Sequence, residues 1–267
     1  MIAYGFAGGD VGVDLEIARR IGADCVEVLP DWRGFPDPEV IRDRVADSGL
    51  AIHSAHGCWG GQSISGVRVD LAQENDAARS SSLADLRRCV DWLARAGGSC
   101  LVVHPGGLSS PEQAEARRHR LKDGLVALAD HAVGTGVVVC VENMPPGVHP
   151  GSRMADLFDL VSEIDHPSLA LALDTGHGHL NGSAADETAK AGHRLATTHV
   201  HDNDGRLDSH LPPGLGTIDW GGWVAALDSI AYRGPIMLEC IRHLRQFSST
   251  ISEGLQGRLR RISGLDR

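Results

Sequence analysis

No run of apolar residues in this sequence approaches the roughly 20 that a transmembrane helix needs. The N-terminal sequence MIAYGFAGGDVG also lacks the basic region and the longer apolar segment of a secretory signal. We therefore expect no membrane partner and a cytoplasmic location.

Closely spaced cysteine pairs are missing as well. The sequence contains 6 cysteines, none in a C-x-x-C arrangement, and most of them fall within apolar strand or helix patterns. We interpret them as small buried residues of a protein from a reducing compartment. Cys58 and Cys240 are less certain, because both lie near candidate site residues.

Basic and aromatic residues are few. Lys and Arg number 25 against 35 Asp and Glu, which gives a formal net charge of −10, and aromatic residues make up 4%. Proteins bind nucleic acids largely by neutralising phosphates with cationic side chains. The charge therefore argues against extensive nucleic-acid binding, although it is compatible with a local basic cleft.

The sequence also lacks a good G-x-G-x-x-G motif after its first apolar run, where FAGGDVG is a poor match. An open doubly wound sheet that binds a dinucleotide normally carries that motif. Its absence disfavours this architecture.

Short apolar runs alternate with longer amphipathic segments along the chain. The short runs are rich in Val, Ile, Leu and small residues, which is typical of strands covered on both faces. They predict strands at 2–7, 25–29, 50–56, 100–104, 137–142, 169–174, 196–201 and 235–239. Three- and four-residue apolar spacing predicts helices at 74–96, 111–133, 153–165, 184–193 and 220–232. With no linker-like segment, this alternation predicts an α/β fold, a (β/α)8 TIM barrel forming a single domain over residues 1–267.

Metal-binding residue types stand at the ends of six successive predicted strands. In a barrel these ends meet at one rim, where active sites are built. A single histidine there is usually structural, and a buried ionisable group costs several kcal/mol unless it is paired or coordinated. Six in succession point instead to a metal site, formed by His56, His104, Glu142, Asp174, His199 and Glu239, with His177, Asp208 and His210 added from loops.

This mixture of carboxylates and imidazoles suits Zn²⁺, Mn²⁺, Fe²⁺ or Co²⁺, whereas Mg²⁺ and Ca²⁺ favour fewer imidazoles. Glu27, in the second predicted strand, either is structural or faces the barrel mouth as a substrate-binding or supporting group. His201 and Asp202 follow His199 closely enough to orient a ligand. Trp32, Trp59 and Trp220 either line a substrate pocket or pack in the core and loops, and packing is the preferred interpretation.

The motifs SAHG, VVHPGG, VENMP, LDTGHG, THVHDNDG, DSHLPPGLGTIDW and IMLEC resemble the xylose-isomerase-like barrel superfamily. The resemblance extends from the second predicted strand to the eighth. This superfamily includes sugar and sugar-phosphate isomerases and epimerases, and also apurinic/apyrimidinic endonucleases with three zinc ions. It implies a metal-dependent enzyme.

The two branches imply different metal counts. In the epimerase branch one divalent metal is held by four groups, which correspond to Glu142, Asp174, His199 and Glu239, and His177 matches a substrate contact. In the endonuclease branch nine ligands hold three zinc ions, and all nine have counterparts here: His56, His104, Glu142, Asp174, His177, His199, Asp208, His210 and Glu239. The expected cofactor is therefore one divalent metal, with up to three under the second branch.

The first functional hypothesis is isomerisation or epimerisation of a sugar or sugar phosphate. The metal would polarise a carbonyl, and Glu142 and Glu239 would move the neighbouring proton through a metal-bound enediolate. His177 would donate a hydrogen bond to the developing oxyanion. The remaining candidate residues, Glu27, His56, His104 and His210, would bind the substrate.

The alternative is phosphate-ester hydrolysis by a multi-zinc cluster, which explains His56, His104, Asp208 and His210 directly. Other metal-dependent lyase chemistry and a non-catalytic metal-binding module are further interpretations. The NMP after Glu142 and the absence of aromatic and Gly-Tyr features from DTGHGHLNG differ from the repair enzymes. Together with the excess of acidic over basic residues, these departures favour a small sugar-like substrate over nucleic acid. A homo-oligomer is compatible with the sequence, which identifies neither the sugar nor the native metal.

Overall fold

The strands of this protein form a closed parallel barrel. The computed structural model describes residues 2–7 and 11–246, and within them one eight-stranded sheet has the order β7-β6-β5-β4-β3-β2-β1-β8. Its strands are β1 (Ile2–Ala7), β2 (Cys25–Leu29), β3 (Ala51–His56), β4 (Cys100–Val103), β5 (Val138–Glu142), β6 (Leu169–Asp174), β7 (Leu195–His199) and β8 (Ile236–Leu238). The barrel closes beyond β7, where the backbone N–H of Val200 donates to Met237 O at 2.7 Å and that of Glu239 donates to Val200 O at 3.0 Å.

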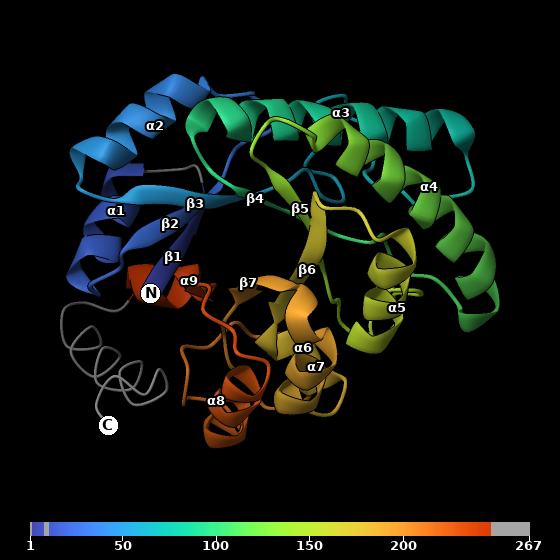
Figure 1. The fold of residues 1–267 in the computed structure, drawn as a ribbon. Helices are drawn as coiled ribbons and strands as arrows, with labels where there is room; N and C mark the ends of the chain where they lie inside the picture. Colours follow the sequence, from blue (N-terminus) through green and yellow to red (C-terminus); the bar gives the residue numbers. More distant parts are fainter. Residues whose placement is uncertain (1, 8–10, 247–267) are drawn as a thin grey trace.

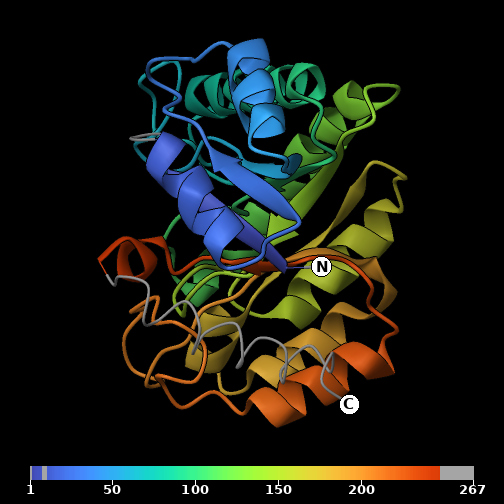
Figure 2. The same cartoon turned by 90° about the vertical axis from the view of Figure 1, so that its left-hand side faces the viewer.

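Helices surround this barrel (Figures 1 and 2). The long helices α3 and α4 lie along one side, and α6, α7 and α8 lie on the opposite side (Figure 1). The described helices are α1 (Val11–Arg20), α2 (Pro38–Asp47), α3 (Asp76–Ala96), α4 (Ala114–Ala132), α5 (Met154–Ile164), α6 (Thr175–Leu180), α7 (Ala184–Ala191), α8 (Trp220–Ser229) and α9 (Ile241–Gln246), with 3-10 turns η1 (Pro111–Gln113) and η2 (Gly192–Arg194). None of these described helices is both long and apolar enough to cross a membrane.

The two faces of each strand meet different surroundings. Leu101 and Val139 belong to the large apolar cluster that includes the helix residues Leu121 and Leu125. The alternate positions, among them Val102 and Cys140, belong to a separate small cluster inside the barrel. Because side chains on a strand alternate between faces, the next residues of this inward register are His104, Glu142 and Asp174. His199 joins them because it pairs with Asp174, after a register shift between β6 and β7. The fold therefore sends the predicted ligands toward the barrel mouth.

Most predicted elements are confirmed, with small shifts at their ends. The predicted helix 111–133 begins as the turn η1 before α4, and α3 ends at Ala96 with Gly97 as its C-cap, whose φ of 81° suits glycine. The sequence pattern predicts no specific helix at the positions of α1, α2, α6 and α9. All six cysteines are buried and free, as predicted. The end of the predicted domain, 247–267, lies outside the described residues.

Candidate metal and active site

The structure brings all nine predicted ligands together at the carboxyl ends of the strands. Together with His201 they form three neighbouring groups, and within each group the candidate ligand atoms all lie within 4.8 Å of one another. The central group contains Glu142, Asp174, His199 and Glu239; the entry group contains His56, His104 and Glu142; and the loop group contains His177, His201, Asp208 and His210. Glu142 belongs to two groups, so the central and entry groups are continuous.

His199 is the hub of the central group. Its Nδ1 lies 2.8 Å from Glu142 Oε1 and 3.4 Å from Glu239 Oε2. On the other side of the ring, Nε2 lies 2.8 Å from Glu27 Oε1, and Glu27 Oε2 accepts a 2.6 Å hydrogen bond from Ser54. Glu27 thus faces the barrel interior and fixes the orientation of His199, which the sequence left undecided.

These contacts shift the protonation of the buried groups. Burial alone would lower the pKa of His199, but the carboxylates of Glu239, Glu27 and Glu142 raise it well above its usual value. Burial alone would raise the pKa of Glu142, but His199 and His104 hold it well below its usual range. These carboxylates therefore stabilise a positive charge among them. The same electrostatic environment favours the binding of a metal cation.

Asp174 ends β6 and begins α6. Its Oδ1 caps the helix by accepting the backbone N–H of His177 at 2.6 Å, and its Oδ2 lies 3.0 Å from His201 Nε2. Asn143 clamps the Asp174 backbone by accepting from its N–H at 2.7 Å and donating to its carbonyl at 3.1 Å. Gly176 is required here, because a Cβ would collide with the His201 ring. Sequence reasoning missed Asn143, although it directly follows Glu142 in VENMP.

Three histidines of the entry and loop groups share one orientation. Nδ1 lies 2.8 Å from a backbone carbonyl in each: Gly57 for His56, Asn143 for His177 and Glu239 for His210. Because a carbonyl only accepts, each Nδ1 carries the hydrogen, and Nε2 has its lone pair available in the neutral ring. A backbone partner of this kind commonly orients a metal-binding or substrate-binding imidazole.

The entry group contains an unsatisfied buried oxygen. Nε2 of His56 lies 3.1 Å from Nε2 of His104, and Glu142 Oε2 lies 3.7 Å and 3.3 Å from these two atoms. Glu142 Oε2 is nevertheless buried and has no hydrogen-bond partner among the described residues. Burial lowers the pKa of His104, which favours its neutral, ligating form. An orphaned carboxylate oxygen beside imidazole nitrogens fits a site for a divalent cation.

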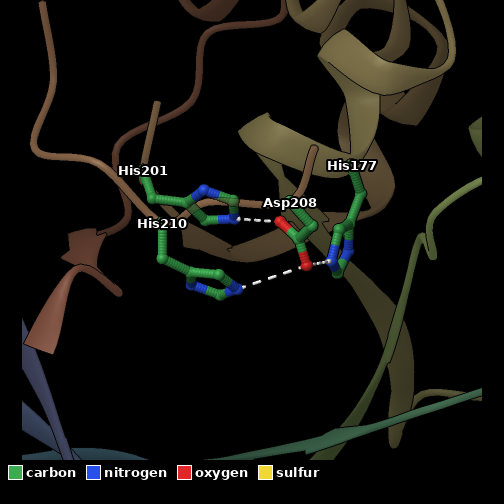
Figure 3. A group of neighbouring side chains, drawn as sticks. All are labelled: His177, His201, Asp208 and His210. Carbon is green, nitrogen blue, oxygen red and sulfur yellow. Dashed lines mark hydrogen bonds and ion pairs between the residues drawn. The ribbon is translucent and has the colours of Figure 1, made fainter. Parts of the chain in front are cut away.

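The loop group converges on Asp208 (Figure 3). Asp208 Oδ2 lies 3.3 Å from Nε2 of both His177 and His210, and Oδ1 lies 3.6 Å from His201 Nε2. The His201 ring stacks on that of His210 with 3.9 Å between centroids. His201 had been predicted only to orient a ligand; its signal was the two-residue spacing from His199. Asp202 instead braces the loop by accepting from Gly214 N and Trp220 Nε1.

A cavity of about 250 Å³ opens onto these groups. Its lining residues are Leu29, His56, Trp59, His104, Glu142, Met144, Pro145, His177, Asp208, His210 and Glu239. Trp59 both lines the cavity, with its ring centroid 4.8 Å from that of His56, and packs against the apolar core. The packing prediction therefore holds in part for Trp59, which also takes the alternative position in the pocket wall. It is confirmed for Trp32, which is fully buried and donates to His56 O at 3.0 Å.

Comparisons with known proteins agree with this architecture. The sequence model of the xylose isomerase-like TIM barrel family matches residues 15–261. L-ribulose 3-epimerase of Methylomonas sp. is 28% identical over 83% of this chain and 75% of its own length. Ketose 3-epimerase of Arthrobacter globiformis is 27% identical over 87% of this chain and 76% of its own length. The crystal structure of a D-tagatose 3-epimerase-like protein superimposes with a TM-score of 0.82 at 20% identity, covering 98% of both chains, a likeness in fold.

Proposed function

The chain belongs to the xylose isomerase-like TIM barrel family, and we propose that it is a divalent-metal-dependent epimerase or isomerase of a sugar or sugar phosphate. One observation carries this proposal: Glu142 from β5 and Glu239 from the end of β8 both approach Nδ1 of His199, at 2.8 Å and 3.4 Å. Two carboxylates beside one cavity suit a reaction that removes and returns a proton. The names of the two epimerase relatives support the same class of reaction.

The central group, Glu142, Asp174, His199 and Glu239, would hold the metal. When bound, a divalent cation supplies Lewis-acid polarisation of the substrate carbonyl. The chain contributes the orientation of the ligands. Glu27 fixes the His199 ring and Asn143 fixes the Asp174 backbone, so neither ligand needs to reorganise when substrate arrives.

Glu142 and Glu239 would exchange the proton with the substrate. Inversion at the carbon beside a carbonyl requires removal of its proton from one face and delivery of a proton to the other. The two residues stand on different strands and both line the cavity, so each can serve one face. His177, also in the cavity wall, would donate a hydrogen bond to the oxygen on which negative charge develops.

The cavity itself favours a small polar substrate. Its volume of about 250 Å³ lies below the roughly 300 Å³ typical of the smallest sites for drug-sized ligands. His56, His104 and His210 line it and offer hydrogen-bonding groups to hydroxyls. The apolar wall, which includes Trp59 and Met144, limits the access of water to the reacting carbon.

Product analysis tests this function. The purified chain is supplied separately with Mn²⁺, Co²⁺ and Zn²⁺. Each metal-loaded sample is incubated with D-fructose, D-tagatose, D-allulose and L-ribulose and, in separate reactions, with the phosphate esters of these sugars. We expect a new epimer or aldose from at least one of them, lost on chelation and restored by metal. No product from any sugar with the metal-loaded protein would contradict the proposal.

A second function, hydrolysis of a phosphate ester, is favoured by one observation. The entry and loop groups place further candidate ligands beside the central group. Under that function His56, His104, Asp208 and His210 would hold additional cations rather than substrate. Cleavage of an abasic-site DNA duplex or of bis(4-nitrophenyl) phosphate, abolished by Asp208→Asn, would support it over the epimerase.

A further inference from the structure

A second cavity of about 250 Å³ adjoins the site cavity. Both are lined by Trp59, His104, Met144 and Pro145, so these side chains form a shared wall. We call the second cavity the annex. Beyond the shared wall, its other side chains are Arg68, Val69, Leu108 and Val148, with glycine backbone between them. The two cavities are therefore neighbours, and a ligand bound in the site cavity lies against side chains that also line the annex.

The annex has a predominantly apolar wall with one exposed leucine at its edge. Leu108 as a whole residue is 80% exposed although it lines a cavity. It lies over Gly147, where an added Cβ would stand 3.3 Å from Leu108 Cδ2. Covering such a side chain with an apolar group of a ligand is favourable, because apolar surface leaves water.

The loops that build the annex are tied to each other. Leu108 stands on the loop after β4, and the next residue, Ser109, donates its backbone N–H to Gly147 O at 2.9 Å. The Ser109 hydroxyl also donates to His149 O at 3.0 Å and accepts from His149 N at 2.9 Å. These bonds join the loop after β4 to the loop after β5, so the backbone beside Leu108 is held in place.

A buried ion pair anchors the same two loops. Arg117 NH2 lies 3.0 Å from Asp70 Oδ2, and both side chains are about nine-tenths buried. Asp70 also accepts the backbone N–H of Gly107 at 3.1 Å, and Arg117 Nε donates to His149 O at 3.0 Å. The annex is thus preformed, which reduces the entropy that a ligand must overcome on binding.

We propose that the substrate is a sugar with an apolar, ring-shaped substituent, and that the annex binds this substituent while the sugar lies against the central group. This inference rests on the epimerase function proposed above. Trp59 and Leu108 would contact the substituent, and the exposed Arg68 can cover its outer face with its side-chain stem or by a cation–π contact. The preponderance of apolar side chains in the annex favours such a group over a phosphate.

The chemistry restricts where the substrate carbonyl stands. In a glycoside the anomeric carbon is an acetal, so a ring hydroxyl must already be oxidised to a ketone before a neighbouring C–H becomes acidic. A dehydrogenase must then supply the substrate, by transferring the carbinol hydrogen as a hydride to a nicotinamide or flavin and releasing the hydroxyl proton to a base or to solvent. Epimerisation itself breaks and re-forms one C–H bond with no net change in electrons.

Binding of two unreactive glycosides tests the annex apart from any chemistry. Methyl β-D-glucoside and phenyl β-D-glucoside contain no ketone, and their dissociation constants can be measured by quenching of tryptophan fluorescence and by NMR titration. We expect the phenyl glycoside to bind about tenfold more tightly, since burial of part of a phenyl ring and of Leu108 is worth about 1.4 kcal/mol. Equal affinities would overturn the proposal.

Variants test whether the annex is the source of the expected preference for the phenyl glycoside. Leu108→Ala should reduce the phenyl-to-methyl affinity ratio by about fivefold, whereas the control Val133→Ala, at a 60% exposed valine after α4, should leave the ratio unchanged. An unchanged ratio in Leu108→Ala would overturn the assignment of the annex. Tighter binding of D-glucose 6-phosphate than of the phenyl glycoside, lost in Arg68→Gln, would show an anion site instead and would equally overturn it.

An activity comparison separates this inference from the proposed function. The 3-keto derivatives of the same two glycosides are incubated with the metal-loaded protein, and their rates of epimerisation are compared. Faster turnover of the phenyl compound supports both proposals. If the phenyl glycoside binds preferentially but no ketone sugar is turned over, the annex proposal is retained and the epimerase function is rejected. If ketone sugars are turned over without any preference for the phenyl compound, the epimerase function is retained and the annex proposal is rejected.

Discussion

Glu27 and His199, 172 positions apart in the chain, are joined by a 2.8 Å contact between Oε1 and Nε2 inside the barrel. The contact occupies the side of the imidazole that faces away from Glu142, so Nδ1 is left to face the acids of the central group. Both side chains are fully buried. A strand near the start of the chain thereby determines the orientation of a candidate ligand near its end.

Removal of this support should weaken metal binding. Glu27→Ala leaves the Nε2 side of His199 without its partner, and loss of such a supporting group typically lowers metal affinity 10- to 100-fold. Competition with a fluorescent zinc chelator measures the effect. Glu27→Gln can still accept a hydrogen bond, so its metal affinity should lie between those of Glu27→Ala and the wild type. Wild-type affinity in Glu27→Ala would show that the contact is only structural.

Neutralising either carboxylate of the proposed proton-transfer pair should abolish most turnover. Glu142→Gln and Glu239→Gln should each lower kcat by about 10²- to 10⁴-fold, the usual contribution of a positioned acid or base. Circular dichroism should remain that of a folded barrel. Glu163→Gln is the matched control, because Glu163 is an exposed residue paired with Arg118 and Lys122. Activity in Glu239→Gln equal to that of the control would remove Glu239 from its role.

The number of metals per chain distinguishes the two proposed functions. The epimerase account predicts about one tightly bound metal by mass spectrometry of the native protein. It also predicts that His56→Asn and His104→Asn keep this number and raise KM, since both residues would contact substrate. Three metals per chain, falling to two in these variants, would favour the phosphoesterase.

The buried pair Asp70–Arg117 should be important for stability. Arg117→Met leaves the Asp70 carboxylate buried without its cation, and breaking such a pair typically costs about 3–5 kcal/mol. Urea unfolding should show this loss, with partial recovery in Arg117→Met/Asp70→Asn. The half-exposed pair Arg95–Glu39 provides the comparison, since Arg95→Met should cost less than about 1 kcal/mol. An equal loss of unfolding free energy in Arg117→Met and Arg95→Met would contradict the role of the Asp70–Arg117 pair as an anchor of the two loops.

The strands and their ligand ends were predictable because both follow from local pattern. Val102 and His104, like Cys140 and Glu142, are two residues apart, so the inward face of each strand leads directly to a candidate ligand. The partner of Glu27 could not be predicted in this way, because the contact depends on closure of the barrel. For Trp59 the sequence left a place in the pocket wall as the alternative to packing, since no local pattern decides between the two.

Exchange of solvent deuterium into a ketose tests the central claim most directly, that Glu142 and Glu239 move a proton at the carbon beside a carbonyl. The metal-loaded protein is incubated in D₂O with each ketose that it binds, and NMR locates the label. The account predicts deuterium at that carbon in the epimer and in recovered substrate, with none in Glu142→Gln/Glu239→Gln. A product without deuterium, or no exchange in any ketose, would contradict it.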